Sequence, residues 1–154
     1  MVKFMSDTPS IFSVSPYSSS VAREMYPGQL GQDDQQDAAR HMLASGTLAR
    51  KYGPNVAQLL GKAHEWSVSP LQALMMMIGQ RQPTPEYLMD TRNNALGAQL
   101  GARAKTQSDL EDLVQSEAER AQLNAPSGRA VIRKAQGGAV RSPLNYVKEC
   151  SCHG

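Results

Sequence analysis

The sequence predicts an all-α fold, a small bundle of about five helices with extended N- and C-terminal arms. Its 154 residues, with 16 Lys plus Arg against 14 Asp plus Glu, fit one modest domain better than two. Hydrophobic residues make up 40% and aromatic residues only 5%, so the apolar content comes mainly from Ala, Leu and Met, which favours helices over strands. The composition also changes twice, which divides the chain into a Ser/Pro-rich arm over 1–32, a helical domain over 33–123 and a basic tail over 124–154.

The basic tail has five Lys and Arg residues opposed by one acid, Glu149. Such a charge balance is compatible with binding to nucleic acid or to an acidic protein surface, but charges spread over thirty residues are also typical of a solvated tail. Cys150 and Cys152 are separated by one residue, which leaves little room for relaxed disulfide geometry. With His153 they supply only part of a metal site, so no metal and no cofactor is expected.

No membrane span and no signal peptide are expected. The longest apolar run, Ala73 to Ile78, has six residues, whereas a membrane-spanning helix needs roughly 20. The first residues carry one early lysine, Lys3, but no apolar segment follows it as a signal peptide would require.

The first two helices are predicted on either side of Gly53. Acids at the start favour a helix N-terminus through the backbone dipole, so a helix is expected over about 34–52. A second helix, Pro54 to Glu65, starts with proline at its first position and packs against the first as a hairpin. Its predicted buried side consists of Val56, Leu59, Leu60 and Ala63.

Three further helices are predicted after this hairpin. Ser69-Pro70 opens an apolar helix that runs to Ile78, and Thr84-Pro85 opens the longest one, Pro85 to Lys105. The sequence Ser108-Asp109-Leu110-Glu111 is predicted to be the capping box of a fifth helix that ends near Leu123. The leucines expected to be largely buried in the core are Leu59, Leu60, Leu96, Leu100 and Leu113.

Small and polar residues form a stripe on the fourth predicted helix. Asp90, Asn94, Gly97 and Gly101 follow at steps of four, three and four, which places them on one face, and Asn93 flanks them. A glycine inside a helix costs about 1 kcal/mol relative to alanine. Two glycines on one face therefore indicate the close approach of another helix or of a ligand.

Polar residues on three helices suggest a site, with two interpretations. In a convergent catalytic site, His41 or His64 would act as general base or metal ligand. Asp90 would orient the histidine or coordinate the metal, and Asn94 would donate to an oxyanion. In a structural network, the same groups would satisfy one another in the core. The candidate catalytic residues are His41, His64, Glu65, Asp90 and Asn94, and the candidate binding residues are Arg40, Ser45, Asn93 and Gly97.

Three blocks of these residues resemble a known domain. They read Arg40-His41 with Ser45, Ala63-His64-Glu65, and Met89-Asp90 with Asn93-Asn94 and Gly97. This is similar to the R-H-x(3)-S, A-H-E, M-D-x-x-N-N-x-x-G series of a little-characterised small helical domain of phage and bacterial secreted or effector proteins, over about 37–101. The chain has Ala44 where that family often has Trp, and an insert from Trp66 to Tyr87. The resemblance implies a helical fold and a phage or effector setting, hence a location in a virion or in host cytoplasm.

Two functions are expected on these grounds. The first is a phage virion-associated structural, assembly or ejection protein that binds neighbouring protein subunits through its arms. The alternative is a hydrolase-like effector that acts on a cell-envelope polymer or another host target through the His, Glu, Asp and Asn residues. Phosphate-binding loops, zinc-protease motifs and serine-hydrolase elbows do not occur in the sequence, so those mechanisms are not expected.

Overall fold

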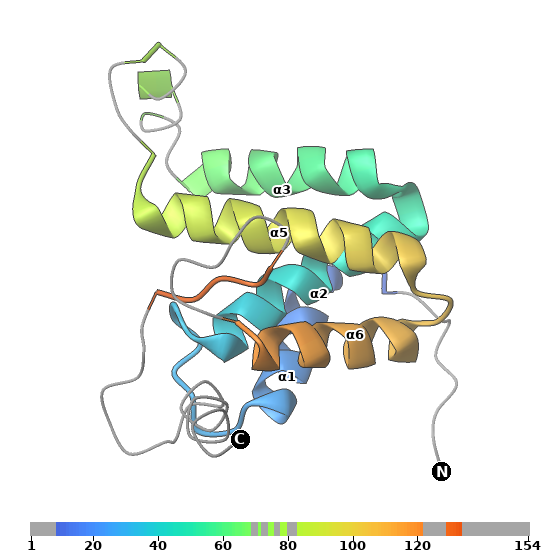
Figure 1. Ribbon diagram of the computed structural model, residues 1–154. Coiled ribbons are helices and arrows are strands. Elements are labelled where there is room, and N and C mark those ends of the chain that lie inside the picture. Colours follow the sequence, from blue (N-terminus) through green and yellow to red (C-terminus); the bar gives the residue numbers. More distant parts are fainter. Residues whose placement is uncertain are drawn as a thin grey trace.

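The protein is a bundle of helices. The computed structural model describes residues 9–68, 71, 74, 75, 78, 79, 83–121 and 129–133, with side chains described outside 64–68. In these ranges the elements are α1 (Val14–Met25), α2 (Gln35–Tyr52), α3 (Pro54–Val68), α5 (Pro85–Arg103) and α6 (Gln107–Glu119). Figure 1 shows α3 and α5 side by side, with α2 crossing behind α5, and with α6 in front of α1 below them. The predicted all-α class is confirmed.

Helix α1 corrects the prediction of an extended arm, because residues 14–25 of that segment are helical. Val14, Ser18 and Ala22, spaced four residues apart, are buried on one side of α1, and α1 packs against α2. Pro16 lies in the first turn, where the missing N–H has no helical partner to lose. The helix was not predicted because the segment is rich in serine, and one of its three buried residues, Ser18, is itself polar.

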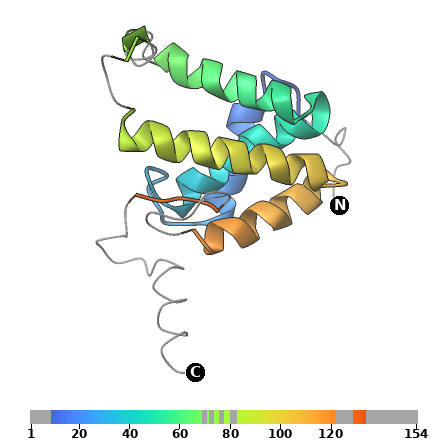
Figure 2. The ribbon, with the colours of Figure 1, turned by 45° about the horizontal axis from the view of Figure 1, so that its top comes forward.

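Helix α2 is the central element, and it contacts each of the other four helices. Its N-cap is Asp34, whose carboxylate accepts a hydrogen bond from the Asp37 N–H, and Gly53 ends it with a φ of 88°. Met42 and Leu43 are fully buried in the main core. Figure 2 shows from a second direction how α2 lies between the α3–α5 pair and α1. The predicted boundaries of this helix are confirmed within a residue.

Glycines allow α2 and α5 to cross at backbone contact. A Cβ on Gly97 would lie 2.3 Å from the Met42 carbonyl oxygen, and one on Gly101 would lie 2.1 Å from the Gly46 carbonyl oxygen. Both distances are too short for any side chain, so this part of the stripe is explained by the close approach of another helix. The same α5 face continues one and two turns earlier with Asn94 and Asp90, which therefore also face α2.

Helix α3 buries a different side from the one predicted. Ala57 is fully buried and Gly61 lies against Asn94, whereas Leu59 is 67% exposed. Of the other residues predicted on the buried side, Leu60 is partly buried, and Val56 and Ala63 are exposed. The physical reason is that α3 packs through its smallest residues, which let it approach α2 and α5 closely and turn its larger apolar side chains outward.

The helix predicted from Ser69-Pro70 to Ile78 falls largely outside the described residues. Leu71, Leu74 and Met75 are helical, and the Ile78 N–H donates to the Leu74 carbonyl oxygen over 3.1 Å. Leu71 and Leu74 are exposed.

Helices α5 and α6 begin at capped N-termini. Thr84 accepts a hydrogen bond from the Tyr87 N–H at the start of α5, as the cap-then-proline pattern predicts. The capping box of α6 is formed by Thr106 and Asp109 rather than by Ser108 and Glu111. Two Thr/Ser-x-x-acid patterns overlap here with an offset of two residues, and the earlier one caps the helix. Of the leucines predicted in this part of the core, Leu96 and Leu100 are buried and Leu113 is partly buried.

Residues 129–133 of the predicted basic tail pack onto the helical core. Ala130, Val131 and Ile132 are buried. The buried Asn93 amide donates to the Val131 carbonyl oxygen over 2.9 Å and accepts from the Val131 N–H over 2.8 Å. Arg133 pairs with Asp33 and Glu86. This part of the tail is therefore held by the core; Cys150, Cys152 and His153 lie outside the described residues.

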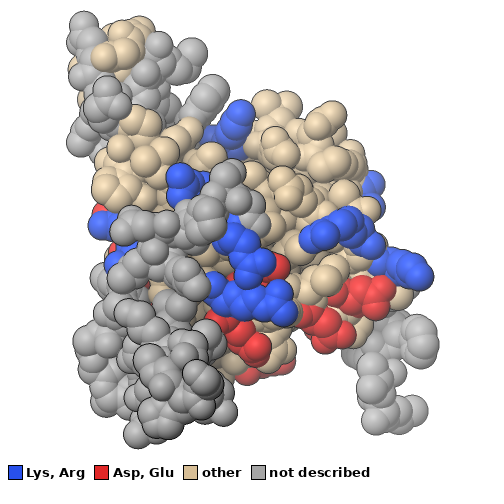
Figure 3. Space-filling model, in the orientation of Figure 1, with Lys and Arg blue, Asp and Glu red and all other residues tan. Residues whose placement is uncertain are grey.

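No described helix combines the length and the apolar character that crossing a bilayer requires. Figure 3 shows that, on the face seen in Figure 1, basic and acidic side chains are intermixed below α3.

Candidate active site

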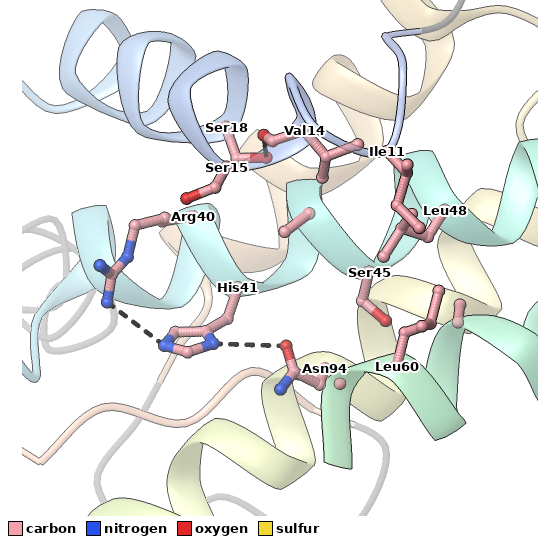
Figure 4. Close-up of a pocket in the computed structure, with 13 residues that line it drawn as sticks. Ile11, Val14, Ser15, Ser18, Arg40, His41, Ser45, Leu48, Leu60 and Asn94 are labelled. Carbon is pink, nitrogen blue, oxygen red and sulfur yellow. Dashed lines mark hydrogen bonds between the residues drawn. The ribbon is translucent and has the colours of Figure 1, made fainter. Parts of the chain in front are cut away.

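His41 lies at the centre of the candidate site, on α2. Its side chain is only 12% exposed. Its Nδ1 lies 3.3 Å from the Asn94 Oδ1 on α5, as Figure 4 shows. With the proton on Nδ1, the ring donates to the Asn94 carbonyl oxygen, and this fixes the tautomer so that Nε2 carries the lone pair. Asn94 thus orients His41.

Two carboxylates face the other ring nitrogen. The His41 Nε2 lies 3.3 Å from the Asp90 Oδ1 and 3.7 Å from the Asp37 Oδ1. The Asp90 Oδ1 is buried, and no described residue forms a hydrogen bond of good geometry with it. A lone pair and a carboxylate oxygen repel unless positive charge or a proton lies between them. When the Asp90 carboxyl is protonated, its O–H can donate to the Nε2 lone pair, and this satisfies both atoms.

The pKa of the Asp90 carboxyl is raised to about 7, mainly by burial. The neighbouring Asp37 carboxylate contributes to this rise, as do Asp33 and Glu86, and the Arg40 guanidinium opposes it. At neutral pH this carboxyl is therefore divided between its acid and its anion. Acid–base catalysis requires a group with a pKa close to the working pH.

The cluster also has the composition of a small cation site. One atom each of Asp37, His41 and Asp90 lie within 4.8 Å of one another, so the three could supply ligands to a metal ion. Arg40, however, forms an ion pair with the Asp37 Oδ1 through its Nη2, which also lies 3.3 Å from the His41 Nε2. Because this guanidinium already places positive charge where a metal would bind, the arrangement favours a proton-transfer hypothesis over a metal site.

A cavity of about 220 Å³ opens beside His41. It lies between α1, α2, α3 and α5, and its walls combine an apolar part with a polar part (Figure 4). The apolar part is formed by Ile11, Val14, Ala44, Leu48, Ala57 and Leu60. The polar part is formed by Ser15, Ser18, Arg40, His41, Ser45 and Asn94, with Gly61 beside them.

Ser45 contributes a buried hydroxyl to this cavity. The residue is 3% exposed, and its Oγ has no hydrogen-bond partner within the described part of the chain. An activated serine nucleophile is hydrogen-bonded to its base, so Ser45 and His41 are not arranged as such a pair.

The structure brings together some of the predicted site residues and separates others. His41, Asp90 and Asn94 meet directly, with Arg40 and Ser45 next to them. Asn93 and Gly97 have other roles, because Asn93 holds Val131 and Gly97 contacts the α2 backbone. The side chains of His64 and Glu65 lie outside the described residues, although α3 continues through both positions, one turn beyond Gly61.

Sequence reasoning missed Asp37 and the contribution of α1. The sequence indicates Asp37 only as an acid at a helix start, but it precedes His41 by four residues and so lies on the same face of α2. That spacing was a usable signal. The cavity residues from Ile11 to Ser18 gave no such signal, because their segment was expected to be extended.

Comparison with known proteins identifies the family. A family profile described as "Domain of unknown function (DUF6973)" matches residues 2–123. The chain belongs to this family. The DUF6973 match includes all five labelled helices and every predicted site residue, and it agrees with the expectation of a little-characterised domain. No curated protein and no solved structure matches the chain.

Proposed function

We propose that this DUF6973 domain is a hydrolase-like enzyme in which His41 and Asp90 transfer protons. The observation that carries the proposal is the position of His41, which contacts the Asp90 carboxyl with Nε2 and at the same time lines the cavity. A buried acid next to a histidine at a cavity wall is costly to maintain, and such arrangements concentrate at catalytic sites.

In the proposed reaction, the His41–Asp90 pair, with the ring neutral and Asp90 ionised, takes a proton from a water molecule as that water attacks the substrate. The new bond joins the water oxygen to the electrophilic carbon, and the pair then returns the proton to the leaving group as the scissile bond breaks. Arg40, which pairs with Asp37 and whose Nη2 lies 3.3 Å from the His41 Nε2, helps to hold the ring and the Asp37 carboxylate in place. Asn94 keeps the ring in the productive tautomer.

The setting that we propose follows from the motif resemblance: a phage or secreted effector protein that cleaves a cell-envelope polymer or another host target. The test is a hydrolysis screen of the full chain on peptidoglycan, phospholipid vesicles, nucleic acid and simple acyl esters. We expect turnover on at least one substrate class. We also expect His41→Ala and Asp90→Asn to lower kcat at least a hundredfold, the usual scale for a proton-transfer residue.

The matched control is Asp112→Asn, an identical substitution at an exposed position on α6, which should retain full activity. Glu65→Gln and His64→Ala test whether the predicted α3 residues belong to the same site. Turnover that survives both His41→Ala and Asp90→Asn would disprove the assignment. The assignment also fails if no substrate class is cleaved at any pH between 5 and 9.

A second candidate function is assembly through protein subunits, as a virion-associated protein. The observation that favours it is the exposure of Phe12, at 92%, and Leu30, at 88%, which flank α1 in the segment predicted to bind neighbours. We propose that the neighbour in such an assembly is a second copy of the chain. Light scattering should then show an oligomer that Phe12→Ser with Leu30→Ser converts to a monomer. A wild-type chain that stays monomeric at high concentration would exclude this function.

Nucleic acid binding through the basic tail is a further proposal with less structural support. Within residues 129–133, Arg129 pairs with Glu117, and Arg133 pairs with Asp33 and Glu86. These two arginines are therefore already neutralised by acids of the core. Fluorescence anisotropy with a short labelled DNA at two salt concentrations tests the proposal, because phosphate contacts weaken steeply as salt rises; a signal that does not depend on salt would exclude it.

A further inference from the structure

We infer that the cavity beside His41 binds the apolar chain of a neutral carbonyl compound, an ester or amide of a medium-length acyl group. The inference rests on the proposed function, because it names the substrate class of the same site. It can nevertheless be tested by binding alone. It depends on the apolar and polar parts of the cavity lining and on the buried Ser45 hydroxyl.

The apolar end defines the chain. Ile11, Val14, Leu48 and Leu60, from four different parts of the fold, line this end. An apolar cavity of about 150 Å³ accommodates one benzene molecule. The present cavity, of about 220 Å³, therefore accommodates roughly six to nine carbon atoms by the same measure.

The polar end defines the head group. The Ser45 hydroxyl is buried at the cavity wall, and none of the described residues forms a hydrogen bond with it. In Figure 4 it lies on the same side of α2 as the His41 ring, facing Leu60 and Asn94. A buried hydroxyl without a partner carries a desolvation cost, which a ligand oxygen that accepts its hydrogen bond would recover. A carbonyl oxygen meets this requirement.

Charge favours a neutral head group over a carboxylate. Asp37 and Asp90 lie directly behind His41, with their oxygens 3.7 Å and 3.3 Å from Nε2. Arg40 is already paired with Asp37, so its charge is largely balanced. An anion placed beside Ser45 and His41 would meet these carboxylates at short range, whereas an ester or amide would not.

The test uses methyl ketones, which present a carbonyl group and an alkyl chain but cannot be hydrolysed. Isothermal titration of the full chain with 2-pentanone to 2-undecanone should show affinity rising about fourfold for each methylene. We expect the rise to stop at about nine carbons, where the cavity is full. Octanoate, the anionic arm, should bind more weakly than 2-nonanone. Affinity that does not depend on chain length, or tighter binding of octanoate, would overturn the inference.

Three variants locate the binding. Ser45→Ala should weaken ketone binding by about 2- to 13-fold, which corresponds to the loss of one hydrogen bond. It should not lower thermal stability, because the hydroxyl it removes bonds to none of the residues that the structure describes. Ala44→Leu, which fills the cavity, should abolish binding, and its control Ala102→Leu is exposed on α5. Leu60→Ala enlarges the cavity and should move the optimal chain to longer ketones. An unchanged optimum in Leu60→Ala, together with unchanged affinity in Ser45→Ala, would place the binding elsewhere.

The proposed catalytic role and the proposed acyl-binding cavity can be refuted independently of each other. If ketones bind as expected but no ester, amide or polymer is cleaved, the cavity assignment stands and the catalytic role of His41 and Asp90 fails. If a substrate is cleaved in a His41-dependent manner while no ketone binds, the catalytic role stands and the acyl specificity is wrong.

Discussion

Asp90→Asn should stabilise the protein, and the gain should grow with pH. The folded protein holds the pKa of the Asp90 carboxyl at about 7, against 3.8 for an unperturbed aspartate. Between these two values the folded state binds more protons than the unfolded state, so this group makes the free energy of unfolding fall as pH rises. The cause is mainly burial, which opposes ionisation. An amide has the same shape but no charge to bury.

The magnitude follows from linkage. One pKa unit corresponds to about 1.36 kcal/mol, so the full shift sets an upper limit of about 4 kcal/mol above pH 7. The Asp90 side chain is 19% exposed, and water near it reduces this cost. We therefore expect Asp90→Asn to gain about 1–3 kcal/mol at pH 8 and less than about 1 kcal/mol at pH 4.

The assay is urea denaturation followed by circular dichroism at pH 4, 6 and 8, with wild type, Asp90→Asn and the exposed control Asp112→Asn. The control should follow the wild type at all three values. If Asp90→Asn is less stable than the wild type at pH 8, the ionised carboxylate is part of a stabilising network, and the catalytic interpretation loses its main support. A gain that does not change with pH would also refute the reasoning, because it would not come from ionisation.

Five further substitutions test the packing and the helix caps that hold the bundle together. Gly97→Ala should lower the free energy of unfolding by at least about 2 kcal/mol, because its Cβ would collide with the Met42 backbone. In the same thermal melts, Gly61→Ala should raise it by up to about 1 kcal/mol, because that Cβ would lie at an ordinary 3.5 Å from Asn94. Asn93→Ala should cost about 2–4 kcal/mol, since it strands the buried Val131 backbone groups, and an unchanged melting temperature would show that residues 129–133 contribute nothing. Thr106→Ala should cost about 0.5–2 kcal/mol through loss of the α6 cap, whereas Ser108→Ala should be nearly neutral.

The sequence predicted the elements whose signals are local. Proline after a cap residue located the start of α5, and glycine located the end of α2, because both depend on backbone geometry at one position. The stripe on α5 was also informative, since a helix repeats its faces every three or four residues whatever its surroundings. It correctly placed Asp90 and Asn94 on the face that meets another helix.

What the sequence could not supply depends on packing partners. The choice between Leu59 and Ala57 as the buried residue of α3 is decided by how closely α2 and α5 approach, and apolar periodicity alone favoured the larger side chain. In the same way, α1 forms because a core is available to cover Val14 and Ala22, although its composition resembles that of a loop. The contacts of His41 with Asp90 and Asn94 could not be predicted, because they depend on how α2 and α5 are placed.

The segment from Ala130 to Ile132 has a consequence for how the protein is made. The family match ends at residue 123, yet these three buried residues and the partner of the Asn93 amide lie beyond it. During synthesis α1 to α6 can leave the ribosome and collapse, but the Asn93 amide has no backbone to bind until residue 131 emerges. The folded part of the chain extends beyond the residues that the family profile matches. A fragment that ends at residue 123 would therefore lack three buried core residues and the partner of the Asn93 amide.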